Sequence, residues 1–154
     1  MASNFPMQTA YGHDKSTVEE YTPGVGANAF VVGDFVILSG VEARVAGVNP
    51  AAILGFSEVR SEDAKLLTQN GKVPVRQITS EHVLQLCSQT TPVEATHLGQ
   101  NYGITKNGTT GNWEVDVTKV GANARVYVDR LNIAEGIWFC KVLAEFISTD
   151  GIVA

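Results

Sequence analysis

The alternation of apolar and polar residues along this 154-residue chain predicts strands and very little helix. Between residues 113 and 118, a tryptophan and two valines alternate with acidic residues and a threonine. Residues 124–133 continue with a similar alternation after a Gly-Ala-Asn turn. Because successive side chains of a strand point to opposite faces, both segments are predicted to be strands with one buried face.

The densest apolar block is Ala29–Val59, which is rich in β-branched and aromatic residues. Only single glycines and the Asn49-Pro50 pair interrupt it. This pattern predicts two or three short strands joined by tight turns, the opening of a small β-barrel or β-sandwich. The block carries no nucleophile, metal-ligand cluster or phosphate loop, so its role is predicted to be architectural.

Further short strands and turns are predicted along the rest of the chain. Ser61 could cap one helical turn, and strands are predicted at 73–78, with Pro74 at an edge or bulge, at 81–89 and at 100–105. An Asn-Gly hairpin is predicted within 107–111. The chain is therefore predicted to be all-β.

The last predicted strand runs from Ile137 to Ile147. Trp138 begins an apolar row on one face, whereas Lys141 lies on the other. Phe139 and Leu143 fall on the Lys141 side, so that side is predicted to be a second covered surface, such as a subunit contact.

Residues 1–28 differ from the body because their apolar residues are isolated and show no period. They are predicted to form an extended N-terminal arm, with 29–154 as the barrel or sandwich domain. Phe5, Tyr11 and Tyr21 are the predicted anchors of this arm on a neighbouring subunit, because aromatic residues dominate interface energetics.

Composition and charge limit the functions that the sequence allows. Fifteen glycines and only 18% charged residues fit a turn-rich all-β protein, and the formal net charge is −5. The sequence has no cluster of positive charge, so direct binding to nucleic acid or to a membrane surface is not predicted. It also has no run of 18 apolar residues, so no bilayer-spanning segment is predicted. The N-terminus lacks a basic and apolar leader, so synthesis in a cytoplasm is expected.

Candidate chemistry is sparse. His82 and His97 lack metal-ligand spacing to the cysteines, and Gly24-Val25-Gly26 does not link a strand to a helix. Cys87 and Cys140 are predicted to be small buried hydrophobes, and whether they pair as a disulfide stays open. No catalytic, cofactor-binding or metal-binding residue is predicted, and an enzyme is not expected.

Four short pieces of the chain carry a resemblance to a known family. They are Gly33-Asp34-Phe35-Val36, Ile53-Leu54-Gly55-Phe56, Val73-Pro74-Val75 and the apolar segment from Trp138 to Ile147. Together these pieces resemble the decoration, or capsid-cementing, proteins of tailed-bacteriophage heads. The resemblance implies a non-enzymatic virion protein that binds the major capsid protein on the outer surface of an expanded capsid. It also implies self-association, often as a homotrimer, after synthesis in the host cytoplasm.

Two other functions remain open at this point. A tail-tube or head–tail connector subunit would share the β-rich composition, and a barrel of this size could also bind a small ligand. The acidic net charge favours a position on the outer surface over contact with packaged DNA.

Overall fold

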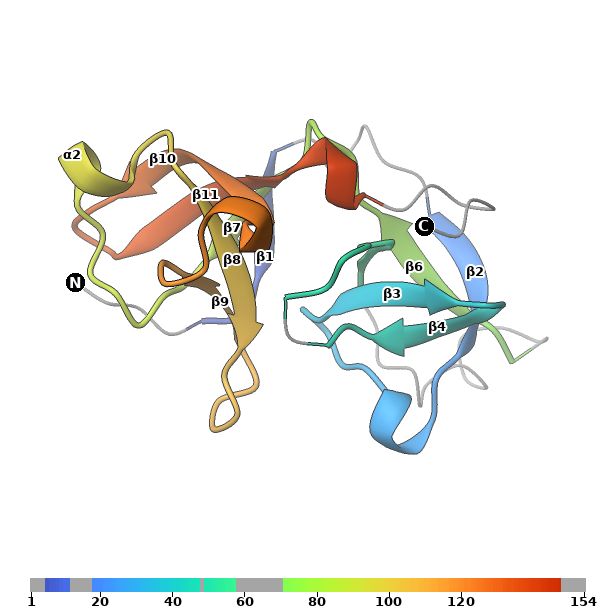
Figure 1. Ribbon diagram of the computed structural model, residues 1–154. Helices are drawn as coiled ribbons and strands as arrows, with labels where there is room; N and C mark the ends of the chain where they lie inside the picture. Colours follow the sequence, from blue (N-terminus) through green and yellow to red (C-terminus); the bar gives the residue numbers. More distant parts are fainter. Residues whose placement is uncertain (1–4, 12–17, 48, 58–70, 148–154) are drawn as a thin grey trace.

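The computed structural model describes residues 5–11, 18–47, 49–57 and 71–147, except for the side chains of Thr9 and Tyr11. Its strands form two β bodies that lie side by side (Figure 1). One is a closed five-stranded barrel in the order β2-β4-β3-β5-β6, and the other is a six-stranded sheet in the order β1-β7-β11-β10-β8-β9. The predicted all-β barrel architecture is confirmed.

The barrel strands are β2 (Val18–Pro23), β3 (Phe35–Ser39), β4 (Glu42–Val45), β5 (Gly55–Phe56) and β6 (Val73–Gln77). The sheet strands are β1 (Gln8–Tyr11), β7 (Val83–Leu86), β8 (Asn101–Lys106), β9 (Trp113–Asp116), β10 (Val126–Asn132) and β11 (Ile137–Val142). Short helical turns are η2 (Gly26–Asn28), α2 (Glu94–His97), η4 (Gly121–Asn123) and η5 (Ala144–Phe146).

The barrel closes because β2 joins both of its ends. It pairs antiparallel with β6 and parallel with the second strand of the β3–β4 hairpin. Inside lies a small apolar cluster that includes Tyr21, Phe30, Val36 and Leu54. Pro74 fits in β6 because β5 reaches only Arg76 and Gln77, so at the proline β6 pairs with β2 alone.

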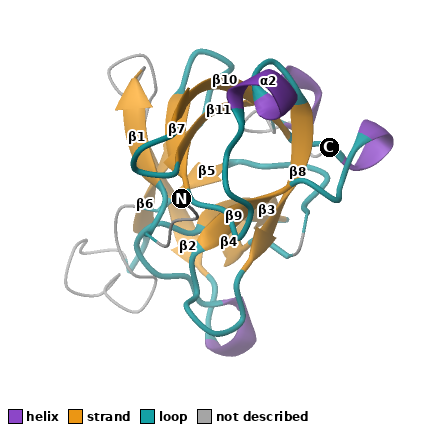
Figure 2. Cartoon of the chain, turned by 90° about the vertical axis from the view of Figure 1, so that its left-hand side faces the viewer, coloured by secondary structure: helices purple, strands orange, loops and turns teal. Residues whose placement is uncertain are grey.

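The six-stranded sheet curls until its far strand returns towards β7. The amide of Val115 in β9 donates to the carbonyl of Cys87 at 2.9 Å, just beyond the end of β7. β1 lies outside this turn of the sheet, beside β7, in both views (Figures 1 and 2). The inner face of the sheet carries both tryptophans, Trp113 and Trp138, which are fully buried.

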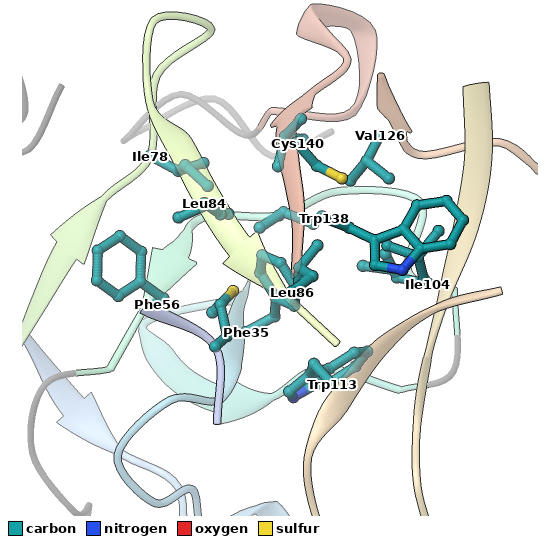
Figure 3. Packing of buried hydrophobic residues seen from close by; sticks show 14 of the residues in the cluster. Phe35, Phe56, Ile78, Leu84, Leu86, Ile104, Trp113, Val126, Trp138 and Cys140 are labelled. Carbon is teal, nitrogen blue, oxygen red and sulfur yellow. The ribbon is translucent and has the colours of Figure 1, made fainter. Parts of the chain in front are cut away.

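One apolar core joins the two bodies. Phe35 and Phe56 of the barrel belong to the same buried cluster as Leu84, Trp113 and Trp138 of the sheet (Figure 3). The rings of Phe35 and Trp113 meet edge to face, with centroids 5.1 Å apart. Since aromatic side chains each bury a large area, this shared core holds the bodies together.

The prediction of a separate arm is wrong for the described parts of residues 1–28. Within β1, Thr9 lies opposite Leu84 of β7, and β2 is a full member of the barrel. The pattern misled because β2 buries only Tyr21 among its six residues, so it shows no alternation. Its partners lie from 20 residues (Thr22 to Glu42) to 58 residues (Val18 to Arg76) further along the chain, where no local signal reveals them.

Other predicted elements need smaller corrections. The last strand stops at Val142 instead of Ile147, because the chain turns into η5. The cysteines are confirmed as buried, and both are free thiols, which answers the question of pairing that the sequence left open. The helical turn predicted after Ser61 lies outside the described residues.

Candidate interaction face

The outward side of the six-stranded sheet is the best candidate for a functional surface. Strand register decides which residues share it, because residues directly opposite each other point to the same face. Tyr127 lies opposite Lys141 and Asn101, and Phe139 lies opposite both Arg130 and Gln85. We define the outer sheet face as Gln85, Asn101, Tyr127, Arg130, Phe139 and Lys141.

A β-bulge in β10 assembles this face. The register with β11 passes from Val128 directly to Arg130 and skips Asp129. In a regular strand, residues three positions apart such as Tyr127 and Arg130 would point to opposite faces of the sheet, because side chains alternate along a strand. The bulge therefore places an aromatic residue and an arginine on the same face, three positions apart.

Contacts within the outer sheet face order its side chains. The guanidinium of Arg130 lies 4.2 Å from the ring centroid of Phe139, a cation–π arrangement. Lys141 Nζ is 3.8 Å from Asp129 Oδ1, an exposed pair that stabilises little. Aromatic residues and arginine are enriched at protein interfaces, so the face has the composition of a docking surface.

The residues predicted as anchors are not brought together. Phe139 lies half-buried on the outer sheet face, and its role in a second covered surface stays a prediction. Leu143 follows the end of β11 and donates its amide to the Arg125 carbonyl at 2.9 Å, beyond the paired residues that define the face. Phe5 is half-buried just before β1.

The tyrosines predicted as arm anchors have other settings. Tyr21 is buried in the barrel core, and its hydroxyl accepts a hydrogen bond from Gln77 at 2.9 Å. That side chain is a barrel residue and is not available to a neighbour. Tyr11 contributes its backbone to β1 opposite Val83, and its side chain lies outside the described part of the structure.

Sequence reasoning missed an internal repeat. The pentapeptide Val-Gly-Ala-Asn-Ala occurs at Val25–Ala29 and again at Val120–Ala124. Both copies form the same 3-10 turn, and the glycine has a φ of 58° in the first and 60° in the second. A search for self-similarity in the sequence would have found it. Each copy leaves its first valine exposed.

Three titratable side chains, those of Cys87, His97 and Cys140, are buried in the protein. Burial raises the pKa of the Cys87 and Cys140 thiols, so both stay protonated at neutral pH and are weak nucleophiles. Burial lowers the pKa of His97, whose Nδ1 accepts the Val93 amide at 2.9 Å. Within the described ranges, no three His, Cys, Asp or Glu side chains are grouped to hold a metal.

A membrane-spanning helix is also absent from the part of the chain that the structure describes. The chain matches no protein-family model, and no curated protein matches it.

Proposed function

We propose that this protein is a virion structural protein that decorates and stabilises the outer surface of a phage capsid by binding the lattice of major capsid protein. The sequence resemblance to head decoration proteins motivates this proposal. The observation that carries it is the outer sheet face, which presents Tyr127, Arg130 and Phe139 together on a rigid sheet.

The physical properties of the face suit a permanent protein contact. Phe139 is held between Gln85 and Arg130 in the sheet, so docking freezes little side-chain motion. The shared core of the two bodies makes the whole unit rigid. Many copies on one capsid lattice turn modest contacts into stable attachment, because each partner is bound at high effective concentration.

Net charge supports an outer location. At −5, the chain would be repelled by packaged nucleic acid, whereas attachment to a protein shell is not opposed in this way. The proposal does not depend on the predicted N-terminal arm, because β1 and β2 are strands of the protein's own sheets.

The test is a binding measurement on expanded capsids that lack the decoration protein. Purified protein is mixed with the capsids, and the bound fraction is measured by co-sedimentation. Wild-type protein is expected to saturate a fixed number of sites. Phe139→Ala is expected to weaken binding about tenfold or more, as for an aromatic residue at the centre of an interface. Val41→Ala, on the β3–β4 turn, is the matched control and should bind like wild type.

Three results would contradict the proposal. One is wild-type protein that leaves the capsids undecorated. Another is rings or tubes formed by the protein alone, which would instead support a tail-tube or connector subunit. The third is a small molecule retained in native mass spectrometry, which would support a ligand-binding barrel.

A further inference from the structure

The two Val-Gly-Ala-Asn-Ala segments, named here the VGANA turns, have the same backbone as well as the same sequence. In the first, the Asn28 amide donates to the Val25 carbonyl at 3.0 Å, and in the second the Asn123 amide donates to the Val120 carbonyl at 3.1 Å. Both opening valines are extended, with φ of −126° and −122°. In Figure 1 the first is the blue turn below the barrel and the second is the orange turn in the other body.

Folding explains part of the repeat. Each glycine has a positive φ, a conformation that glycine adopts without strain. Ala124 is 2% exposed, so its small side chain has a packing role. These requirements account for the glycine and for the last alanine of the second turn.

Folding does not explain the valines. Val25 is 73% exposed and Val120 is 56% exposed, so neither gains much from burial within the protein. The residues that follow the two turns have diverged completely. Phe30 is buried in the barrel core, whereas Arg125 donates from Nε to the Pro50 carbonyl at 2.6 Å. The same exposed valine at the start of both turns, beside such different neighbours, points to a shared external requirement.

We infer that the two VGANA turns are two copies of one recognition element, and that each inserts its valine into an apolar socket on adjacent copies of the same partner protein. This inference rests on the proposed function, in which that partner is the repeated subunit of the capsid lattice. It makes the VGANA turns a second contact region, distinct from the outer sheet face.

The size of the valine supports a repeated partner. One side chain of this size, even fully buried, strengthens binding by only about one to two orders of magnitude. Such a contact is too weak to select a partner by itself. Two equal contacts on one rigid chain act together when the partner presents equal sockets at a fixed spacing, because the second contact is then intramolecular.

The test replaces each valine by threonine, which keeps the β-branched shape and its preference for extended backbone but places a hydroxyl in the socket. Val25→Thr and Val120→Thr are each expected to weaken capsid binding about tenfold, and the double variant further. Val41→Thr is the control, because Val41 is 79% exposed and lies outside both VGANA turns. All variants should unfold at the wild-type denaturant concentration.

The outcomes separate the two proposals. If wild-type protein does not bind capsids, the proposed function is overturned and this inference falls with it. If wild-type protein binds and the double variant binds equally well, only the inference is overturned. Loss of self-association in the double variant, with capsid binding unchanged, would also overturn it, because the socket would then lie on a second copy of this chain.

Discussion

Asp34 and Trp113 form a hydrogen bond that links the two β bodies across 79 positions of sequence. The indole Nε1 of Trp113 in β9 donates to Oδ1 of Asp34 at 3.1 Å, and both residues are buried. Lys106 Nζ approaches the same oxygen at 2.7 Å. Oδ2 accepts the Val31 amide at 2.9 Å, which fixes the carboxylate at the entrance to β3. One side chain therefore organises a turn of the barrel and the β8–β9 hairpin together.

Replacing Asp34 by alanine is expected to lower the free energy of unfolding by about 2–4 kcal/mol. The substitution leaves the Trp113 indole N–H buried without its acceptor and removes the ion-pair partner of Lys106. The exposed part of Lys106 reduces the second effect, because water can solvate the ammonium. Urea-induced unfolding, followed by tryptophan fluorescence, measures the change.

The companion variant is Trp113→Phe, which keeps an aromatic ring against Phe35 but removes the N–H. It is expected to lower the free energy of unfolding by less than Asp34→Ala does, because Lys106 still faces the carboxylate of Asp34. The variant that carries both substitutions should then lose less stability than the two single losses added together, since both substitutions remove the same hydrogen bond. Strict additivity of the two losses would show that the Asp34–Trp113 bond contributes nothing.

Arg125 provides a second link, between the loop after β4 and the η4 turn. Its Nε donates to the Pro50 carbonyl at 2.6 Å, and its Nη1 donates to the carbonyls of Ala122 and Ala124 at 3.0 and 2.8 Å. The guanidinium also lies 4.0 Å from the centroid of the Phe146 ring. Arg125→Lys is expected to lower stability by about 2–3 kcal/mol, because an ammonium cannot reproduce this planar set of donors.

The matched control is Arg130→Lys, at an exposed arginine that is stacked on Phe139. Its effect on stability should stay within about 0.5 kcal/mol, as for most surface substitutions. Thermal unfolding of both variants under the same conditions makes the comparison. Equal losses at the two positions would mean that the carbonyl contacts of Arg125 are not the source of its effect.

Gly55 allows β5 and β6 to approach closely. A Cβ built at this position would lie 2.0 Å from the Arg76 carbonyl oxygen, a clash with backbone and not with a movable side chain. Gly55→Ala is therefore expected to separate the strands and lower the free energy of unfolding by about 2–4 kcal/mol. Gly47→Ala has open space for its methyl group and should be close to neutral. A Gly55→Ala protein with the wild-type melting temperature would contradict this prediction.

The strands that could be predicted from the sequence are those that carry their own signal. β9 and β10 alternate apolar and polar residues over short windows, so the existence of both strands was predictable. The single buried face was predicted correctly for the first part of β10, but in β9 Glu114 is buried as well as Trp113 and Val115. The outward placement of Phe139 followed from the same alternation in β11. Each of these segments meets its main partner in a nearby hairpin, so local pattern and tertiary structure agree.

What could not be predicted depends on distant pairing. β2 was misread because Tyr21 meets Gln77 and Val73 only in the folded barrel, more than fifty positions later. The bulge at Asp129 shows in the sequence only as a one-residue shift of the inward apolar positions, from Val126 and Val128 to Leu131, yet it decides that Arg130 joins Tyr127 on the outer sheet face. The VGANA repeat, by contrast, could be found in the sequence by comparing the chain with itself.

His97 is expected to make stability depend on pH. Its Nδ1 accepts the Val93 amide at 2.9 Å, and its ring lies against Trp138 with centroids 4.9 Å apart, so the fold requires the neutral imidazole. Burial lowers the pKa of His97 from its ordinary value of 6.5, so the unfolded chain binds the proton more readily. The stabilisation from neutral His97 is then complete above about pH 6.5 and is lost as the pH falls through the pKa of His97 in the folded protein. The free energy of unfolding falls by at most about 1.4 kcal/mol per pH unit, because one proton is involved.

His97→Asn tests this, because its amide oxygen can accept the Val93 amide from nearly the same position as Nδ1 but does not titrate. The free energy of unfolding, measured by urea titration from pH 7.5 down to pH 5, should fall more steeply for wild type than for the variant. His13 and His82 are present in both proteins, so their titration cancels in the difference. Parallel curves over this range would show that the fold does not require neutral His97, and that the bond from the Val93 amide to Nδ1 contributes nothing measurable to stability.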